Sequence, residues 1–202
     1  MARRWSARRA AAVLGALALV AVGQAVYATS PAGAAPATLY AYAGGSGSAP
    51  ASCSQSAVQA DECSLSEALL DVQAGGTIVL TTPGTEADTA TYYTTPGGFT
   101  VVGGTSAAPV TIEPATAINA PILDGGSSST VLDVTGGYVD LSGVIVQHGA
   151  SANGAAGQSG GTLQQADGAS GGNGGGIYNA GDLTLTGATI ELNTTGTGGN
   201  GA

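Results

Sequence analysis

Two stretches of the chain decide its fold. Residues 131–148 read VLDVTGGYVDLSGVIVQH, and residues 174–193 read GGGIYNAGDLTLTGATIELN. Aligning Gly143 with Gly187 places apolar residues on apolar residues: Leu132 on Ile177, Val139 on Leu183, Leu141 on Leu185, Val144 on Ala188 and Val146 on Ile190. Each stretch then holds three short strands joined by glycine-containing corners, about twenty residues in all, the size of one coil of a β-solenoid. We predict that they are successive or near-successive coils.

The rest of the chain after Gly76 continues the pattern. Short runs of four to six residues, in which apolar and polar residues alternate, are separated by Gly, Ser, Thr and Pro. Such strands bury one face and expose the other, which suits a β-sandwich as well as a solenoid. Because of the repeated unit, we expect an all-β chain folded as a β-helix. The runs are TIVL, FTVV, PVTIEP, PILDG, TVLDV, YVDL, GVIVQ, GIYN, DLTL and TIEL, and an earlier strand is predicted in TLYAYAGGSG from Thr38.

One short helix precedes the coils. Ser64 and Glu67 have the S-x-x-E spacing of a capping box, in which each side chain accepts from the other's backbone N–H. Apolar residues follow at helical spacing, and Gly75 and Gly76 end the segment. At about two and a half turns the helix is marginal alone, so it must lie on the strands. Its apolar face consists of Leu65, Ala68, Leu69 and Val72.

The first 34 residues are typical of a signal peptide. Four arginines precede an apolar run over residues 10–22, and small residues near Ala28 and Ala34 offer cleavage sites. An uncleaved anchor is the alternative. Cleavage would leave residues 35–76 as the initial strand, cysteine loop and capping helix, and residues 77–202 as coils. We therefore expect an extracellular or cell-surface protein without a membrane segment.

The charge of the chain excludes several partners. The four arginines of the leader are its only Lys or Arg residues, and all thirteen acidic residues follow that leader. A mature chain without a permanent cation cannot neutralise phosphates, which excludes nucleic acid and anionic membranes. Glycans, cell-surface components and cations remain as partners. In an exported chain Cys53 and Cys63 predict a structural disulfide, worth about 3 kcal/mol for so short a loop.

Two glycine-rich segments interrupt or follow the coils. Residues 149–176 contain eleven glycines and only one large apolar residue, Leu163. They bury too little apolar area to offset the entropy of ordering, so we expect a flexible loop leaving a corner, with a disordered insert as the alternative. No polar closing element follows the last strand. This predicts an open or truncated C-terminal end, whose strand edge invites self-association.

The segment ECSLSEALLDVQAGGTIVL, residues 62–80, resembles the CSLREA-type N-terminal segment of secreted bacterial right-handed β-helix proteins. Ser66 stands where that motif has arginine, and Gly76 stands where the aspartate of GDTI is usual. Residues 174–193 are similar to the Gly-Gly-x-Ile repeats of polymorphic outer-membrane proteins. The resemblance implies a right-handed parallel β-helix of the pectin lyase-like fold, in which the helix covers the first coil. That fold hosts lyases, hydrolases, adhesins and passive surface domains alike.

No catalytic residue is assigned from the sequence. Pectate lyase-like chemistry uses Arg or Lys, which the mature chain lacks, and the aspartate clusters of polygalacturonases are absent. Four isolated aspartates could still meet on one face as a glycosidase pair or a calcium site, although solvated carboxylates are commoner. No cofactor is evident in the sequence apart from calcium, which these aspartates could bind. The four are Asp124, Asp133, Asp140 and Asp182.

His148 and several tyrosines complete the candidates. His148 follows a strand without a recognisable partner, which indicates a lone turn histidine. Four tyrosines, Tyr92, Tyr93, Tyr138 and Tyr178, could stack on sugar rings. We therefore expect a structural, adhesive or interaction module with no catalytic site evident. The alternative is the N-terminal part of a polysaccharide-degrading lyase or hydrolase whose active site lies beyond residue 202.

Overall fold

The computed structural model describes residues 37–45, 53, 63–81, 91–94, 98–116, 119–158 and 167–201. All of them belong to one compact unit, Gly33–Ala202. The predicted signal peptide and both of its cleavage sites lie outside the described residues. Within the described ranges, no helix is long and apolar enough to cross a membrane.

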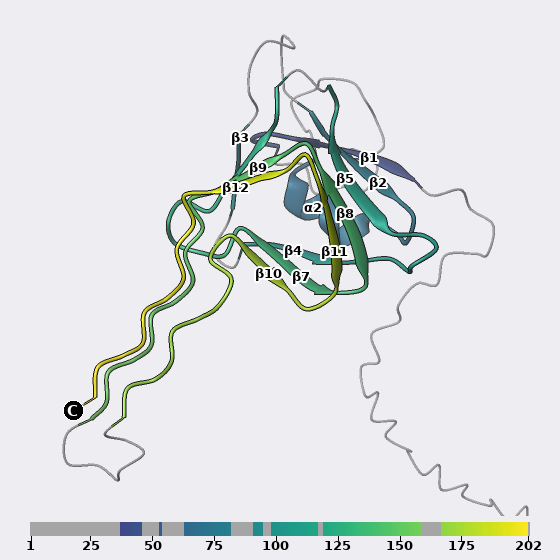
Figure 1. The fold of residues 1–202 in the computed structure, drawn as a ribbon. Helices are drawn as coiled ribbons and strands as arrows, with labels where there is room; N and C mark the ends of the chain where they lie inside the picture. Colours follow the sequence, from purple (N-terminus) through teal and green to yellow (C-terminus); the bar gives the residue numbers. More distant parts are fainter. Residues whose placement is uncertain are drawn as a thin grey trace, which may run out of the picture. The chain divides into compact units, whose positions relative to one another are not determined.

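The chain forms three parallel sheets around a common core (Figure 1). The first sheet has the order β1 (Thr38–Tyr42), β2 (Thr77–Thr81), β5 (Val110–Pro114), β8 (Tyr138–Ser142) and β11 (Asp182–Thr186). The second has the order β12 (Thr189–Glu191), β9 (Ile145–Gln147), β6 (Ile122–Asp124) and β3 (Thr91–Tyr93). The third has the order β10 (Ile177–Asn179), β7 (Leu132–Gly136) and β4 (Phe99–Val102). Successive passes of the chain therefore add one strand to each sheet in turn.

The register between the last two passes confirms the predicted alignment. Leu132 pairs with Ile177, Leu141 with Leu185, and Val146 with Ile190. The corner residues Gly143 and Gly187 have φ values of 60° and 61°. Glycine adopts this left-handed conformation without steric cost, so it recurs at the same corner.

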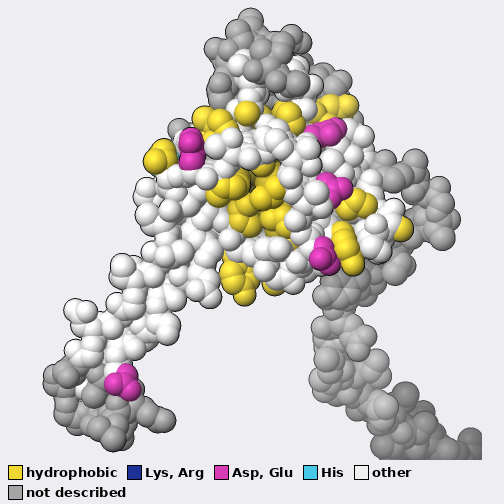
Figure 2. Space-filling model, in the orientation of Figure 1, with side chains coloured by type: hydrophobic (Ala, Val, Ile, Leu, Met, Phe, Trp, Pro, Cys, Tyr) yellow, Lys and Arg dark blue, Asp and Glu magenta, His cyan; other side chains and the backbone are white. Residues whose placement is uncertain are grey.

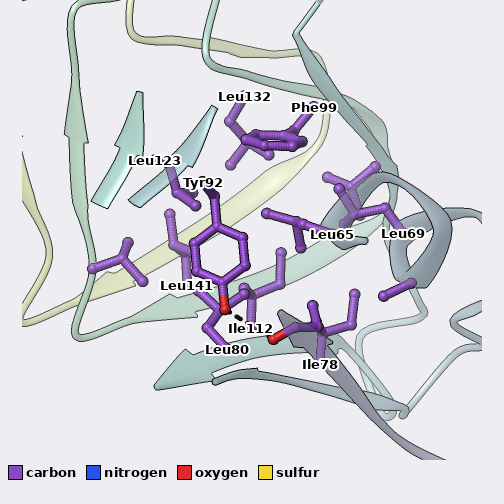
Figure 3. Close-up of a cluster of buried hydrophobic side chains, with 14 of the residues drawn as sticks. Leu65, Leu69, Ile78, Leu80, Tyr92, Phe99, Ile112, Leu123, Leu132 and Leu141 are labelled. Carbon is purple, nitrogen blue, oxygen red and sulfur yellow. Dashed lines mark hydrogen bonds between the residues drawn. The ribbon is translucent and has the colours of Figure 1, made fainter. Parts of the chain in front are cut away.

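The core is built from the inward residues of all three sheets. Ile112, Leu123 and Leu132, one from each sheet, are each 1% exposed and lie in one buried cluster (Figure 3). Strand β3 was not predicted, because TYY shows no alternation of apolar and polar residues. Its Tyr92 is buried, and its hydroxyl donates to the carbonyl of Thr81 at 2.6 Å or Ala41 at 2.8 Å. The hypothesis that Tyr92 stacks on sugars is therefore wrong, and the side chain of Tyr93 lies outside the described residues.

Helix α2 (Leu65–Asp71) packs on β1, β2 and β4. The Ser64 hydroxyl accepts from the Glu67 N–H at 3.2 Å, and Leu65, Ala68 and Leu69 are buried. The Glu67 carboxylate does not accept a hydrogen bond from the Ser64 N–H, so only half of the predicted capping box forms. A disulfide joins Cys53 to Cys63. The carbonyl of Cys63 accepts from the N–H of Tyr42, which connects the cysteine loop to β1.

At the last pass the inward side chains are exposed or only partly buried. Leu185 is 46% exposed, whereas its counterpart Leu141 is fully buried, and Ile190 is 43% exposed against none for Val146. Figure 2 shows hydrophobic side chains gathered at the centre of this face. The end of the core formed by β10, β11 and β12 is thus an apolar surface.

Three glycine-rich segments run side by side away from one corner (Figure 1). We call them the glycine bundle: residues 149–158, 167–176 and 193–201. The N–H groups of Gly154 and Gly157 donate to the carbonyls of Thr197 and Asn200, each at 2.8 Å. Segment 167–176 runs antiparallel between the other two. Backbone hydrogen bonds at the same three-residue spacing join it to both of them. This is the repeat of a polyproline II helix, which has three residues per turn.

Glycine is required at several inward positions of the bundle. In residues 151–157 and 193–199 every third residue is half-buried and the two between are exposed. A Cβ on Gly154 would meet the carbonyl oxygen of Ala169, and one on Gly196 would meet that of Ala152. The expectation of a flexible loop did not anticipate this order, because it considered apolar burial and not backbone hydrogen bonds. In the described residues, 149–158 and 167–176 form a regular hydrogen-bonded array.

Candidate functional site

The candidate site lies at the corner where the glycine bundle leaves the sheets. Residues 125–130, GGSSST, connect β6 to β7 there. Gly126 and Ser127 have φ values of 56° and 57°, a conformation that glycine adopts freely and serine rarely. The N–H of Gly126 donates to Asp124 Oδ1 at 2.8 Å, and that of Ser127 donates to the carbonyl of His148 at 2.7 Å. The first bond closes the serine-rich turn, and the second holds it against the neighbouring pass.

A cleft of about 420 Å³ opens between this turn, the outer face of the third sheet and the base of the glycine bundle. Its volume lies in the range of small-molecule sites. Hydroxyl groups make up most of its polar lining, and Asp133, Asn173 and Tyr178 complete it. The hydroxyl-bearing residues are Ser127, Ser128, Ser129, Thr130 and Ser151.

Asp133 and Tyr178 occupy paired positions on neighbouring strands of the third sheet. Leu132 and Val134 point inward and are buried, so Asp133 between them points outward, as the sequence predicts. Its Oδ1 atom is buried and has no hydrogen-bond partner among the described residues. Tyr178 is 45% exposed. A carboxylate and an aromatic ring therefore stand next to each other in the cleft.

Several hydroxyls of the cleft are held by hydrogen bonds. Ser151 Oγ donates to the carbonyl of Gly172 at 2.7 Å and accepts from the N–H of Gly196 at 2.8 Å, which links the three segments of the bundle. Ser129 Oγ lies 3.0 Å from Thr94 Oγ1. Ser127 and Thr130, by contrast, carry no side-chain hydrogen bond among the described residues. The wall is thus fixed while some of its hydroxyls stay open to a ligand.

An aspartate–histidine pair lies behind the same turn. Asp124 Oδ2 accepts from Gln147 Nε2 at 3.0 Å and lies 2.8 Å from His148 Nδ1. Burial raises the pKa of Asp124, but the hydrogen bonds from His148, Gln147 and Gly126 outweigh it and hold the pKa below its ordinary value. The hypothesis of a lone turn histidine is therefore wrong. The missed signal is the register, since the residue paired with Asp124 is Gln147, next to His148.

The four aspartates are not brought together. Asp124 lies on the second sheet, Asp133 on the third, and Asp140 and Asp182 on the first. The four therefore do not share one carboxylate face, although Asp140 and Asp182 lie on neighbouring strands of the first sheet. Within the described ranges, no three His, Cys, Asp or Glu side chains gather as a metal site. The exposed tyrosines are also separated, with Tyr138 on the first sheet and Tyr178 on the third.

The serine run and Tyr178 were both visible in the sequence, but their proximity depends on how the passes stack. Comparison with known proteins finds no matching family model, no matching curated protein and no matching solved structure.

Proposed function

We propose that the chain is a right-handed parallel β-helix of the CSLREA type that acts at or outside the cell surface as an interaction module. Three parallel sheets with stacked inward residues support the β-helix. Right-handed crossovers are the rule for parallel strands. Helix α2 against β1, β2 and β4 supports a capping role. The Cys53–Cys63 disulfide is compatible with an oxidising compartment.

The observation that carries the interaction role is the cleft. It lies between the serine turn, the outer face of the third sheet and the base of the glycine bundle, and it has a polar lining with one exposed aromatic ring. Tyrosine and serine side chains on a rigid scaffold are typical of antibody recognition loops. The partners we propose are glycans or other cell-surface components.

Retention of the secreted chain on envelope material tests this role. The full chain is expressed with its own leader, labelled, and incubated with isolated cell envelopes and with envelopes stripped of glycans. We expect retention on the former and its loss on the latter. Clean elution from both would contradict the interaction role. Intact mass of the same secreted product reports leader cleavage and the loss of two hydrogens on disulfide formation.

The exposed apolar side chains of the last pass support two further proposals. The exposed Leu185 and Ile190 are compatible with additional coils, as in a polysaccharide-degrading β-helix enzyme whose active site lies beyond residue 202. They also suit self-association through this end. The length of the natural product separates the two, because added coils would cover these side chains. Calcium stabilisation is a weaker proposal, since the candidate carboxylates are spread over three sheets.

A further inference from the structure

We propose that the cleft at Asp133 and Tyr178 binds a neutral saccharide. The inference rests on the proposed interaction role and names the ligand class and the residues that recognise it. Sugars present hydroxyl groups at their edges and C–H groups on their ring faces. A site for them needs hydrogen-bonding groups beside an aromatic surface.

The hydrogen-bonding side of the cleft suits hydroxyl groups. The open hydroxyls of Ser127 and Thr130 can both donate and accept, and the amide of Asn173 offers both functions as well. Asp133 belongs to the same lining and supplies a carboxylate acceptor.

The aromatic side is Tyr178. Its strand pairs with that of Asp133, and paired strands lie about 4.8 Å apart, so the ring stands directly beside the carboxylate. One sugar can therefore stack on Tyr178 and donate a hydroxyl hydrogen to Asp133. Because Tyr178 is 45% exposed, its ring is open to such a ligand.

Charge selects a neutral ligand. Among the described residues that line the cleft, Asp133 is the only carboxylate, and no Lys or Arg lies after residue 9 to bind an anion. An acidic sugar would be repelled by Asp133 without compensation. A metal ion would have a single carboxylate here, which is fewer than calcium sites use.

The serine turn and bundle make the site preorganised. The turn is held by hydrogen bonds of Gly126 to Asp124 and of Ser127 to His148, and Ser151 is held by two bundle segments. Binding then requires little ordering of these walls, which favours affinity.

Calorimetry on the full secreted chain tests the inference. The probes are neutral hexamers of glucose, mannose and N-acetylglucosamine, with a galacturonic acid hexamer as the acidic comparison, each measured with and without EDTA. We expect at least one neutral hexamer to bind, the acidic hexamer not to bind, and EDTA to have no effect. Failure of all three neutral probes, equal binding of the acidic hexamer, or loss of binding in EDTA would each overturn the proposal.

Variants locate the binding site. Tyr178→Ala should weaken binding about tenfold, while Tyr178→Phe keeps the ring and the affinity within about threefold. Tyr138→Ala removes a similarly exposed tyrosine on the first sheet and should have no effect. Asp133→Asn should weaken binding by several-fold. If Tyr178→Ala still binds like wild type, the cleft is not the site.

The same variants separate this inference from the interaction role. Envelope retention that persists in Tyr178→Ala would leave the interaction role standing and reject the cleft. A wild-type chain that elutes cleanly from envelopes but binds a neutral hexamer through Tyr178 would reject the envelope role and keep the saccharide site.

Discussion

His148 and Asp124 face each other across one pass of the chain, with Nδ1 2.8 Å from Oδ2, although they are 24 residues apart in the sequence. Asp124 is 7% exposed, while the His148 side chain is 41% exposed. The pair therefore joins two neighbouring passes at the corner that carries the cleft. It is a structural contact whose strength depends on the charge of the carboxylate.

Asp124→Asn should destabilise the fold by about 1–3 kcal/mol at neutral pH. Asparagine can keep the bond from the Gly126 N–H, but its amide would oppose the donor of Gln147 or lose one of the two contacts at Oδ2. Urea unfolding followed by circular dichroism measures the change. Asp140→Asn, at an outward position without a side-chain hydrogen bond among the described residues, is the matched control and should stay within about 0.5 kcal/mol of wild type. Equal losses in both variants would contradict the role of Asp124.

Acid should remove the stability that Asp124 contributes to the fold. Because the pKa of Asp124 in the folded protein lies below its ordinary value of 3.8, folding favours the ionised form. The resulting stability is present above about pH 4 and is lost as pH falls through the folded pKa. Wild type and Asp124→Asn should therefore differ at pH 7 and converge toward pH 2. A stability difference that stays constant over this range would reject the electrostatic explanation.

Alanine substitutions should distinguish two neighbouring positions of one residue column. Leu141→Ala removes a fully buried side chain and should cost about 2–5 kcal/mol, whereas Leu185→Ala, at the paired position with 46% exposure, should cost less than about half as much. Thermal unfolding of both variants provides the comparison. Similar losses would mean that Leu185 is covered in solution, which sedimentation velocity would then identify as self-association.

Tyr92→Phe should cost about 1–3 kcal/mol, because it leaves the buried carbonyl of Thr81 or Ala41 without the hydroxyl donor. Tyr138→Phe alters a hydroxyl on a 40% exposed residue and should be neutral. Chemical denaturation of the two variants measures the difference. A neutral Tyr92→Phe would show that the hydroxyl contributes little beyond ring burial.

The glycine bundle should respond to single methyl groups. In Gly154→Ala the new Cβ meets the carbonyl of Ala169, so the bundle must separate locally, while in Gly198→Ala the nearest atom is 3.9 Å away. Amide hydrogen exchange should lose protection at Gly154, Gly157 and Gly199 in the first variant only. Protection in the sheets should not change in either variant. Equal exchange in the two variants would contradict the close packing of the bundle.

The strands and their register were predictable because alternation and recurrent glycine corners are local signals. Ten runs after Gly76 coincide with strands, and the pairing of Leu141 with Leu185 follows from one alignment. Strand β3 was not predicted because its buried residue is a tyrosine. The hydrogen bonds that hold the tyrosine hydroxyl are not visible in the sequence. The contact between Asp124 and His148 was not predicted because it forms only between two neighbouring passes of the chain.

The order of the glycine bundle was not predicted, for a different physical reason. Apolar content predicts hydrophobic burial, whereas this segment is ordered by backbone N–H and carbonyl groups at three-residue spacing. The spacing of Gly168, Gly171 and Gly174, and of Gly196 and Gly199, was present in the sequence. A search for glycine every third residue, as in collagen, would have found it.

This arrangement has a consequence for the response to temperature. The core is held by apolar burial, whose contribution weakens on cooling and carries a large heat capacity change. The described segments of the glycine bundle bury no large apolar side chain, so their ordering carries little heat capacity change. As the temperature falls, the driving force of the core declines while the hydrogen bonds of the bundle persist. The two parts of one chain thus have different cold tolerance, and the bundle is the part suited to low temperature.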